Sequence, residues 1–254
     1  MGSQGNRDAP VNSVVKHLAG LRSRGFLYSV GVVVNRIVPA SLFRFRLFSV
    51  YELATDCQWQ VKSSGDVRSN GDAKNWKLIC CRSDEQIREA EQLTFTTVNQ
   101  DDPSAQHQTP WVVQSERDEI FVAGIWVTQG SFDEIDLGVR LLLPDDSRWL
   151  YSAYVDKDFR RRGIYRYLIS NVIDRVSDED AERALVSINP TNRASMAAHR
   201  TLLKRKIGTC VAVKMLCFSM CISSRPLSPR IGVTLQNKRR PIGLCCAGVN
   251  NVQR

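Results

Sequence analysis

A short basic segment, Arg160–Gly163, has the residue types that bind a negatively charged group. It lies between a strand-like and a helix-like stretch, and the first amide groups of a helix have no partner within the helix. These amides lie at the positive end of the helix dipole, and Gly163 lets a ligand approach the backbone closely. The three arginines add positive charge, although a solvated basic turn has the same composition. The segment therefore predicts an anion-binding turn at the start of a helix.

The elements that position this turn are indicated by periodicity in the sequence. After the turn, six apolar residues fall on one face of a predicted helix: Ile164, Leu168, Ile169, Val172, Ile173 and Val176. Further helices are predicted after a capping box at Ser83–Gln86 and over residues 195–203. β-branched and aromatic residues indicate strands over residues 76–80, 111–113, 120–127, 149–155 and 184–188, with one or two closing strands in 207–222. This alternation predicts an α/β body.

The pattern Arg160-x-x-Gly163-x-Tyr165 resembles the pyrophosphate loop, Arg/Gln-x-x-Gly-x-Gly/Ala, of the GNAT superfamily of acyl-CoA-dependent N-acetyltransferases. As in that family, the preceding strand ends in Tyr154-Val155-Asp156, and a second strand with an Asn-led helix follows at Val186–His199. The resemblance covers about residues 74–223. It implies an α/β (α+β) fold with a mixed, mostly antiparallel sheet that is splayed at its centre and flanked by helices.

The same resemblance implies a set of residues that bind acetyl-CoA, the acyl-donor co-substrate. The backbone amides of the loop would hold the coenzyme A pyrophosphate, with Arg160 closing the loop: Arg161, Arg162, Gly163, Ile164 and Tyr165. The main chain at Tyr154 and Val155 would pair with the pantetheine arm, which Asn192 and Ser195 would bind from the other side. Tyr165 stands where the family has Gly or Ala, so its ring is expected to narrow the phosphate site.

The chemistry implied by the resemblance is direct attack of a neutral amine on the thioester, which requires a base and a group that protonates the departing thiolate. His199 stands where many relatives have the tyrosine that protonates this thiolate, and it is equally compatible with a packing role. Glu119 and the cluster Asp133–Asp136 are candidate bases, although the cluster is also suited to attract a cationic substrate or to be only solvated. Either Tyr151 or Tyr154 is expected to line the acyl site, since alternate strand residues face one side.

The chain is expected to divide into three parts, because residues 62–75 turn to Ser, Gly, Asp, Asn and Lys. Residues 1–73 are predicted to be an N-terminal extension and linker, in which Phe43, Phe45 and Leu47 alternate with arginines as in a half-buried strand or a membrane-surface element. Residues 74–223 form the acyltransferase-like domain. Residues 224–254 carry three prolines and no acid and are predicted to be poorly ordered.

The net charge of +9 belongs to the two ends of the chain. Residues 1–50 have seven basic residues and one acid, or +6, and residues 225–254 have six basic residues and no acid, or +6. The remaining body has 22 basic and 25 acidic residues, or −3, which argues against a specific nucleic-acid interface. Basic ends are commonly only solvated, but they also suit weak contact with an anionic surface.

Cysteine usage and hydropathy point to a protein of the cytosol. The eight cysteines form no Cys-x-x-Cys pair, and the three histidines are scattered, so reduced thiols and no metal site are expected. The longest apolar run, residues 26–34, is far shorter than the roughly 18 residues of a membrane span and does not resemble a secretory leader.

Several alternatives remain open from the sequence. A related synthase fold takes long acyl chains from an acidic carrier protein, which the basic N-terminal region would suit. A non-catalytic regulator that binds coenzyme A and a protein that binds lipid or RNA surfaces through its ends are the others. The acceptor is not identified, because it would bind variable loops, here residues 98–109 and 129–148. The oligomeric state is equally open.

Overall fold

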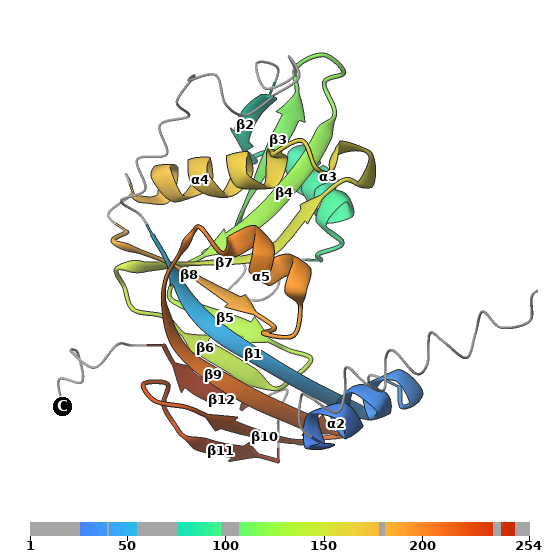
Figure 1. The fold of residues 1–254 in the computed structure, drawn as a ribbon, viewed down its shortest axis with the longest axis vertical. Helices are drawn as coiled ribbons and strands as arrows, with labels where there is room; N and C mark the ends of the chain where they lie inside the picture. The colour runs from blue at the N-terminus through green and yellow to red at the C-terminus, as the bar shows by residue number, and fades with distance from the viewer. Residues whose placement is uncertain are drawn as a thin grey trace, which may run out of the picture.

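The computed structural model describes residues 26–39, 41–54, 76–97, 107–177, 181–235 and 240–246. Its helices are α2 (Phe26–Ile37), α3 (Asp84–Thr94), the 3-10 helix η3 (Lys157–Phe159), α4 (Ile164–Ser177) and α5 (Arg193–His199) (Figure 1). Its strands are β1 (Phe43–Leu53), β2 (Trp76–Cys80), β3 (Thr109–Ser115), β4 (Phe121–Thr128), β5 (Ser131–Glu134), β6 (Val139–Leu142), β7 (Ser147–Val155), β8 (Arg183–Ile188), β9 (Leu203–Met215), β10 (Phe218–Ser223), β11 (Ile231–Thr234) and β12 (Ile242–Cys245).

Nine strands form one sheet in the order β11-β10-β9-β1-β8-β7-β4-β3-β2. Its neighbouring strands run antiparallel except β7 and β8, which run parallel. A second sheet, β12-β6-β5, is smaller. The mixed, mostly antiparallel sheet with flanking helices confirms the predicted fold class.

Helices and the small sheet bury the two faces of the large sheet. The predicted apolar stripe of α4 is buried against one face, where Leu168 and Val172 join a core cluster with Ile125 of β4 and Val186 of β8. α3 packs on the opposite face of β3 and β4. The small sheet shares a second core cluster with β1, β9 and β10. Strands β1, β7 and β8 contribute to both clusters, with neighbouring residues such as Trp149 and Leu150 on opposite faces of the sheet.

The strand predicted over Phe43–Leu47 is confirmed, but its place corrects the prediction that residues 1–73 are an extension outside the domain. β1 lies between β8 and β9, and Val50 is opposite both Ser187 and Gly208. α2 packs against β1, where the Asn35 side chain bonds to both backbone groups of Phe45. The polar segment 62–75 lies outside the described residues. Its composition indicated a boundary, whereas β1 ahead of it belongs to the same sheet as residues 76–223.

The C-terminal segment also corrects a prediction. Residues 224–254 were expected to be poorly ordered, yet β11 pairs with β10, and β12 pairs in parallel with β6. Apolar residues explain the difference, since Ile242 and Leu244 of β12 are buried in the core. Residues 1–25 and the last residues, 247–254, lie outside the described part. In that described part, no helix is long and apolar enough to cross a membrane.

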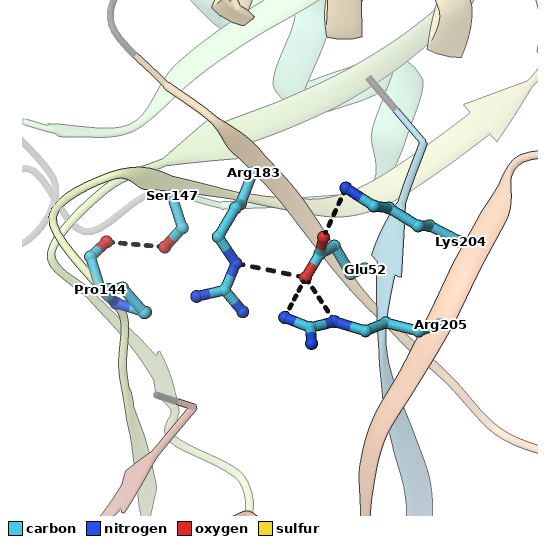
Figure 2. Close-up of polar contacts among 6 residues, drawn as sticks. All are labelled: Glu52, Pro144, Ser147, Arg183, Lys204 and Arg205. Carbon is cyan, nitrogen blue, oxygen red and sulfur yellow. Dashed lines mark hydrogen bonds and ion pairs between the residues drawn. The ribbon is translucent and has the colours of Figure 1, made fainter. Parts of the chain in front are cut away.

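A buried carboxylate ties three strands together at one end of β1. Glu52 is 3% exposed, and its carboxylate contacts Arg183 of β8 at 3.2 Å, Lys204 of β9 at 3.2 Å and Arg205 of β9 at 2.8 Å. Figure 2 shows the carboxylate of Glu52 between these three cations. Burial alone would raise the pKa of Glu52, but the hydrogen bonds and charges of the three cations outweigh it and lower the pKa below its usual value. The carboxylate is therefore held in its ionised form.

Candidate active site

The large sheet opens between its two parallel strands. β7 and β8 pair only from Ser147–Arg183 to Leu150–Val186, after which β7 continues along β4 and β8 along β1. A cavity of about 310 Å³ lies at this opening. Its lining includes side chains from both faces of the sheet and from two helices: Arg46, Glu134, Tyr151, Tyr165, Ser195 and His199. The predicted splay at the centre of the sheet thus creates a cavity with polar groups.

β7 has a bulge at the edge of this cavity. The β4–β7 register passes from Trp126–Tyr151 to Gly124–Tyr154, so Ser152 and Ala153 both lie opposite one residue of β4. Ser152 has a φ of 49°, in the left-handed region that a serine rarely adopts. Both bulged residues line the cavity. The strained backbone therefore lies where the two strands separate, as is typical of functional sites.

His199 and Tyr165 form a hydrogen-bonded pair in the cavity wall. Nδ1 of His199 lies 2.8 Å from the carbonyl oxygen of Ser195, so Nδ1 must be the donor. Nε2 lies 2.8 Å from the Tyr165 hydroxyl. Burial lowers the pKa of His199 despite the bond to Ser195, so the ring is neutral at neutral pH and Nε2 accepts the proton of the tyrosine. Burial also raises the pKa of Tyr165, which keeps its hydroxyl protonated.

The lowered pKa of His199 predicts a pH-dependent stability. The unfolded chain binds a proton near the ordinary histidine value of 6.5, whereas the folded chain resists it. The free energy of unfolding should therefore fall as pH decreases below this value, by at most about 1.4 kcal/mol per pH unit. His199→Gln should reduce this slope in urea titrations between about pH 6.5 and 5. Glu134, whose pKa is raised by burial, gives a slope of opposite sign in both proteins.

The matched control for this prediction is His107→Gln, which removes an exposed histidine. An equal slope in His199→Gln and in the unmodified protein would contradict a neutral, buried His199.

An ion pair lines the cavity on the side of the small sheet. Glu134, at the end of β5, accepts a hydrogen bond of 2.7 Å from the guanidinium of Arg46 on β1. Burial of the carboxyl raises the pKa of Glu134, and the neighbouring Asp136 raises it further, while the Arg46 charge opposes both. Its neighbour Asp133 instead makes a bidentate pair with Arg140. Of the predicted acidic cluster Asp133–Asp136, Glu134 is the member that reaches the cavity.

The predicted anion-binding turn is an open loop between η3 and α4. Arg161 and Gly163 both have a positive φ, of 65° and 81°, and backbone that alternates in this way turns successive amides toward one side. A Cβ atom on Gly163 would meet nothing within 4 Å, so the space above the loop is free. The arginine side chains fold back: Arg160 donates to the carbonyl oxygen of Val155 at 3.0 Å, and Arg162 donates to that of Asp158 at 3.2 Å.

The other predicted site residues lie at varying distances from the cavity. Glu119 is exposed in the β3–β4 turn and does not line the cavity. Tyr154 contacts Phe95 and the guanidinium of Arg160, so Tyr151 is the strand tyrosine in the cavity wall. Asn192 accepts a hydrogen bond from the Ser195 amide and so begins α5. Ile164 is the first residue of α4, and its side chain is buried in the core.

A sequence profile of the Acetyltransferase (GNAT) family matches residues 75–202, which is just over half of the chain. The chain belongs to this acetyltransferase family. The match includes the loop, α4, α5 and the splayed strands β7 and β8, so the residues around the cavity lie within the GNAT domain except Arg46. Strand β1, which supplies Arg46, precedes the matched range and completes the sheet.

Comparisons with solved structures find other GNAT proteins at low identity. A GCN5-related N-acetyltransferase from Kribbella flavida is 10% identical over 65% of this chain, with a TM-score of 0.42, and the match spans 57% of its length. The ribosomal-protein-S18-alanine N-acetyltransferase of Escherichia coli is 13% identical over 50% of this chain and 75% of its own, with a TM-score of 0.36. An aminoglycoside acetyltransferase from an uncultured soil metagenomic sample is 15% identical over 50% of this chain and 87% of its own, with a TM-score of 0.37. The curated proteins contain no match.

Two side chains in the cavity wall were not predicted from the sequence. Arg46 lies 88 residues from Glu134 in the chain, and no local pattern indicates that the two meet. The Tyr165 ring was expected to narrow the phosphate site, whereas its hydroxyl bonds to His199 in the cavity wall; the prediction for its backbone amide is unaffected. A side chain two residues after Gly163 can face either the loop or α5, and the sequence pattern does not decide between them.

Proposed function

We propose that the protein is an N-acetyltransferase that transfers the acetyl group of acetyl-CoA to a primary amine by direct attack. The observation that carries the proposal is a cavity that joins both faces of the sheet, with a carboxylate at one side and a tyrosine–histidine pair at the other. In the reaction, the amine nitrogen bonds to the thioester carbonyl carbon, the carbon–sulfur bond breaks, and the sulfur leaves as a thiolate. The acceptor is not identified.

The loop before α4 is the proposed site for the coenzyme A pyrophosphate. The free space over Gly163 and the positive φ of Arg161 and Gly163 favour an anion held by the backbone amides of residues 161–165. Arg160 and Arg162 supply positive charge next to it. The Val155 carbonyl accepts a bond from Arg160, so Arg160 must turn toward the phosphate before that carbonyl pairs with the pantetheine arm. Asn192 and Ser195, at the start of α5, would bind that arm from the opposite side.

The residues in the cavity have distinct proposed roles. Glu134 is the base that removes a proton from the amine, because a carboxyl with a raised pKa accepts a proton near neutral pH more readily than an exposed one. Tyr165 turns its single hydroxyl proton from Nε2 of His199 to the departing sulfur, and His199 is a positioning residue that holds the tyrosine before the thiolate forms. The bulged backbone at Ser152 and Ala153 is suited to donate to the carbonyl oxygen as negative charge develops on it.

The test of the donor site is a thermal-shift titration with acetyl-CoA, free coenzyme A and palmitoyl-CoA. A ligand at about 100 times its dissociation constant should stabilise the fold by roughly 2.7 kcal/mol. The variant Arg162→Glu/Gly163→Asp should lose this shift, measured from its own unliganded midpoint, because a carboxylate then occupies the anion site. Arg175→Glu, an exposed charge reversal at the other end of α4, is the matched control.

Stabilisation by acetyl-CoA and coenzyme A that is lost only in the loop variant supports the proposal, and release of free thiol with a panel of amines would then identify acceptors. A shift with palmitoyl-CoA alone would replace the acetyl donor by a long-chain donor. If none of the three ligands shifts the midpoint, the loop does not bind coenzyme A and the proposal fails.

A further inference from the structure

One face of the β10–β11 strand pair is apolar and exposed. Ile222 lies opposite Ile231, and Met220 lies opposite Val233, and residues opposite each other in neighbouring strands share a face. The exposed fractions are 48% for Ile222, 66% for Ile231 and 58% for Val233. We refer to Ile222, Ile231 and Val233 as the open face. Apolar side chains gathered on one surface in this way are typical of an interaction site.

The opposite face of the same two strands is covered by the small sheet. Cys221 is buried, and a Cβ atom on Gly232 would collide with Ile242 of β12. Residues of β11 therefore alternate between a side that packs on β12 and an exposed side with Ile231 and Val233. Packing among the described residues explains the buried side, and none of these residues accounts for the apolar side chains of the open face.

Helix α2 extends this apolar surface. It packs on Phe45 of β1. Phe45 lies opposite Val213 of β9, and Val213 lies opposite Met220 of β10. Because residues opposite each other share a face, α2 is on the same side of the sheet as the open face. Val33 and Ile37 of α2 are also exposed. Figure 1 shows α2, β10 and β11 together at one end of the molecule, with α4 at the other end. A partner bound there would leave the loop before α4 accessible.

The segment that forms the open face has no acidic residue. Residues 203–246, from β9 to β12, contain no Asp or Glu. Of their basic residues, Lys204 and Arg205 pair with Glu52 near the start of β9, and Lys214 is buried. Arg225 and Arg230 are exposed in the connection before β11, and Arg240 is exposed in the connection after it. The exposed apolar residues of β11 are thus flanked by cations at both ends of the strand.

We propose that the open face binds the surface of a membrane that contains anionic phospholipids. Lipid head groups supply the negative charge that the cations require, and the acyl-chain boundary accepts protruding aliphatic side chains without a shaped groove. A second copy of the chain would place like charges against each other. Nucleic acid would match the cations but leave Ile231 and Val233 without an apolar partner.

The test is co-sedimentation of the full chain with vesicles. Vesicles of phosphatidylcholine with roughly one third phosphatidylserine should bind the protein, and pure phosphatidylcholine vesicles should bind it at least about tenfold less, since each cation favours the anionic surface. Added salt should weaken the binding. Ile231→Asp/Val233→Asp should reduce the partition coefficient at least about tenfold by adding charge and removing aliphatic contacts. Both positions are more than half exposed, so the fold should tolerate the change.

The matched control is Ile120→Asp/Ile135→Asp, which makes the same kind of change at exposed residues outside the acid-free segment. This control should bind vesicles like the unmodified protein. Equal binding to both vesicle types, equal loss in both double variants, or no binding would overturn the proposal. So would a dimer in sedimentation velocity that dissociates only in Ile231→Asp/Val233→Asp, because a second copy would then occupy the face.

Discussion

Glu134→Gln should lower kcat/KM for acetyl transfer by about 10²- to 10⁴-fold, the usual contribution of a general base. The amide keeps the size of the carboxylate and a hydrogen-bond acceptor for Arg46, but it does not take a proton from the amine. The effect should appear mainly in kcat, because the base acts on the bond that forms in the transition state. Steady-state kinetics with a fixed amine and varied acetyl-CoA measure it, with circular dichroism to show that the variant is folded.

Asp133→Asn is the matched control for this change. Asp133 is the adjacent residue of β5 and makes its own ion pair, with Arg140, but it does not line the cavity. Its loss should leave kcat within about a factor of two, since a partly exposed ion pair contributes little. A similar fall of kcat in both variants would mean that the ion pairs only support the small sheet, and Glu134 would then not be the base.

A pH profile separates catalysis from structural support. The charge of Arg46 lowers the pKa of Glu134 against the effect of burial. Arg46→Gln removes that charge, so the pKa of Glu134 should rise and the acidic limb of kcat/KM should move to higher pH. If Arg46→Gln lowers kcat/KM by the same factor at every pH, the acidic limb does not reflect protonation of Glu134.

The loop before α4 and the helix itself were predictable because their signals are local. Gly163, the arginines before it and the apolar stripe of α4 lie within one turn and one helix, and the structure places the loop and α4 as expected. The acidic cluster Asp133–Asp136 was also visible as a local run of residues in the sequence. The choice of Glu134 over Asp133 depends on which side of β5 meets the cavity, and that in turn depends on how the small sheet packs.

The place of β1 was not predictable from local patterns. Val50 pairs with Gly208, and residues this far apart leave no periodicity that links them. The polar composition of residues 62–75 indicated a boundary, since long connections and domain linkers have the same residue types. The consequence reaches the cavity, because Arg46 of β1 contacts Glu134 there. A residue outside the matched range of the family thus contributes to the candidate site.

Glu52→Gln should lower the free energy of unfolding by about 3 kcal/mol, because it removes the counter-charge of a buried cation. Most of this cost arises at Arg183, because its side chain is only 14% exposed. The side chains of Lys204 and Arg205 are about half exposed and can turn to solvent. One nitrogen of Arg183, Nη2, is already buried without a hydrogen-bond partner. The neutral amide introduced by Glu52→Gln would leave this guanidinium without the negative charge that it contacts.

Urea denaturation at neutral pH measures this loss, and Lys204→Gln is the control, with an expected change of at most about 1 kcal/mol because the lysine is exposed. The lowered pKa of Glu52 also determines how its contribution to the free energy of unfolding changes with pH. Its contribution is complete above the ordinary value of 4.5 and is lost as pH falls below it, so the difference between Glu52→Gln and the unmodified protein should shrink in acid. Replacing both partners, Glu52→Leu with Arg183→Met, should recover most of the lost stability, since no charge is then buried. A double variant as unstable as Glu52→Gln would place the cost in packing between β1, β8 and β9 instead of in charge.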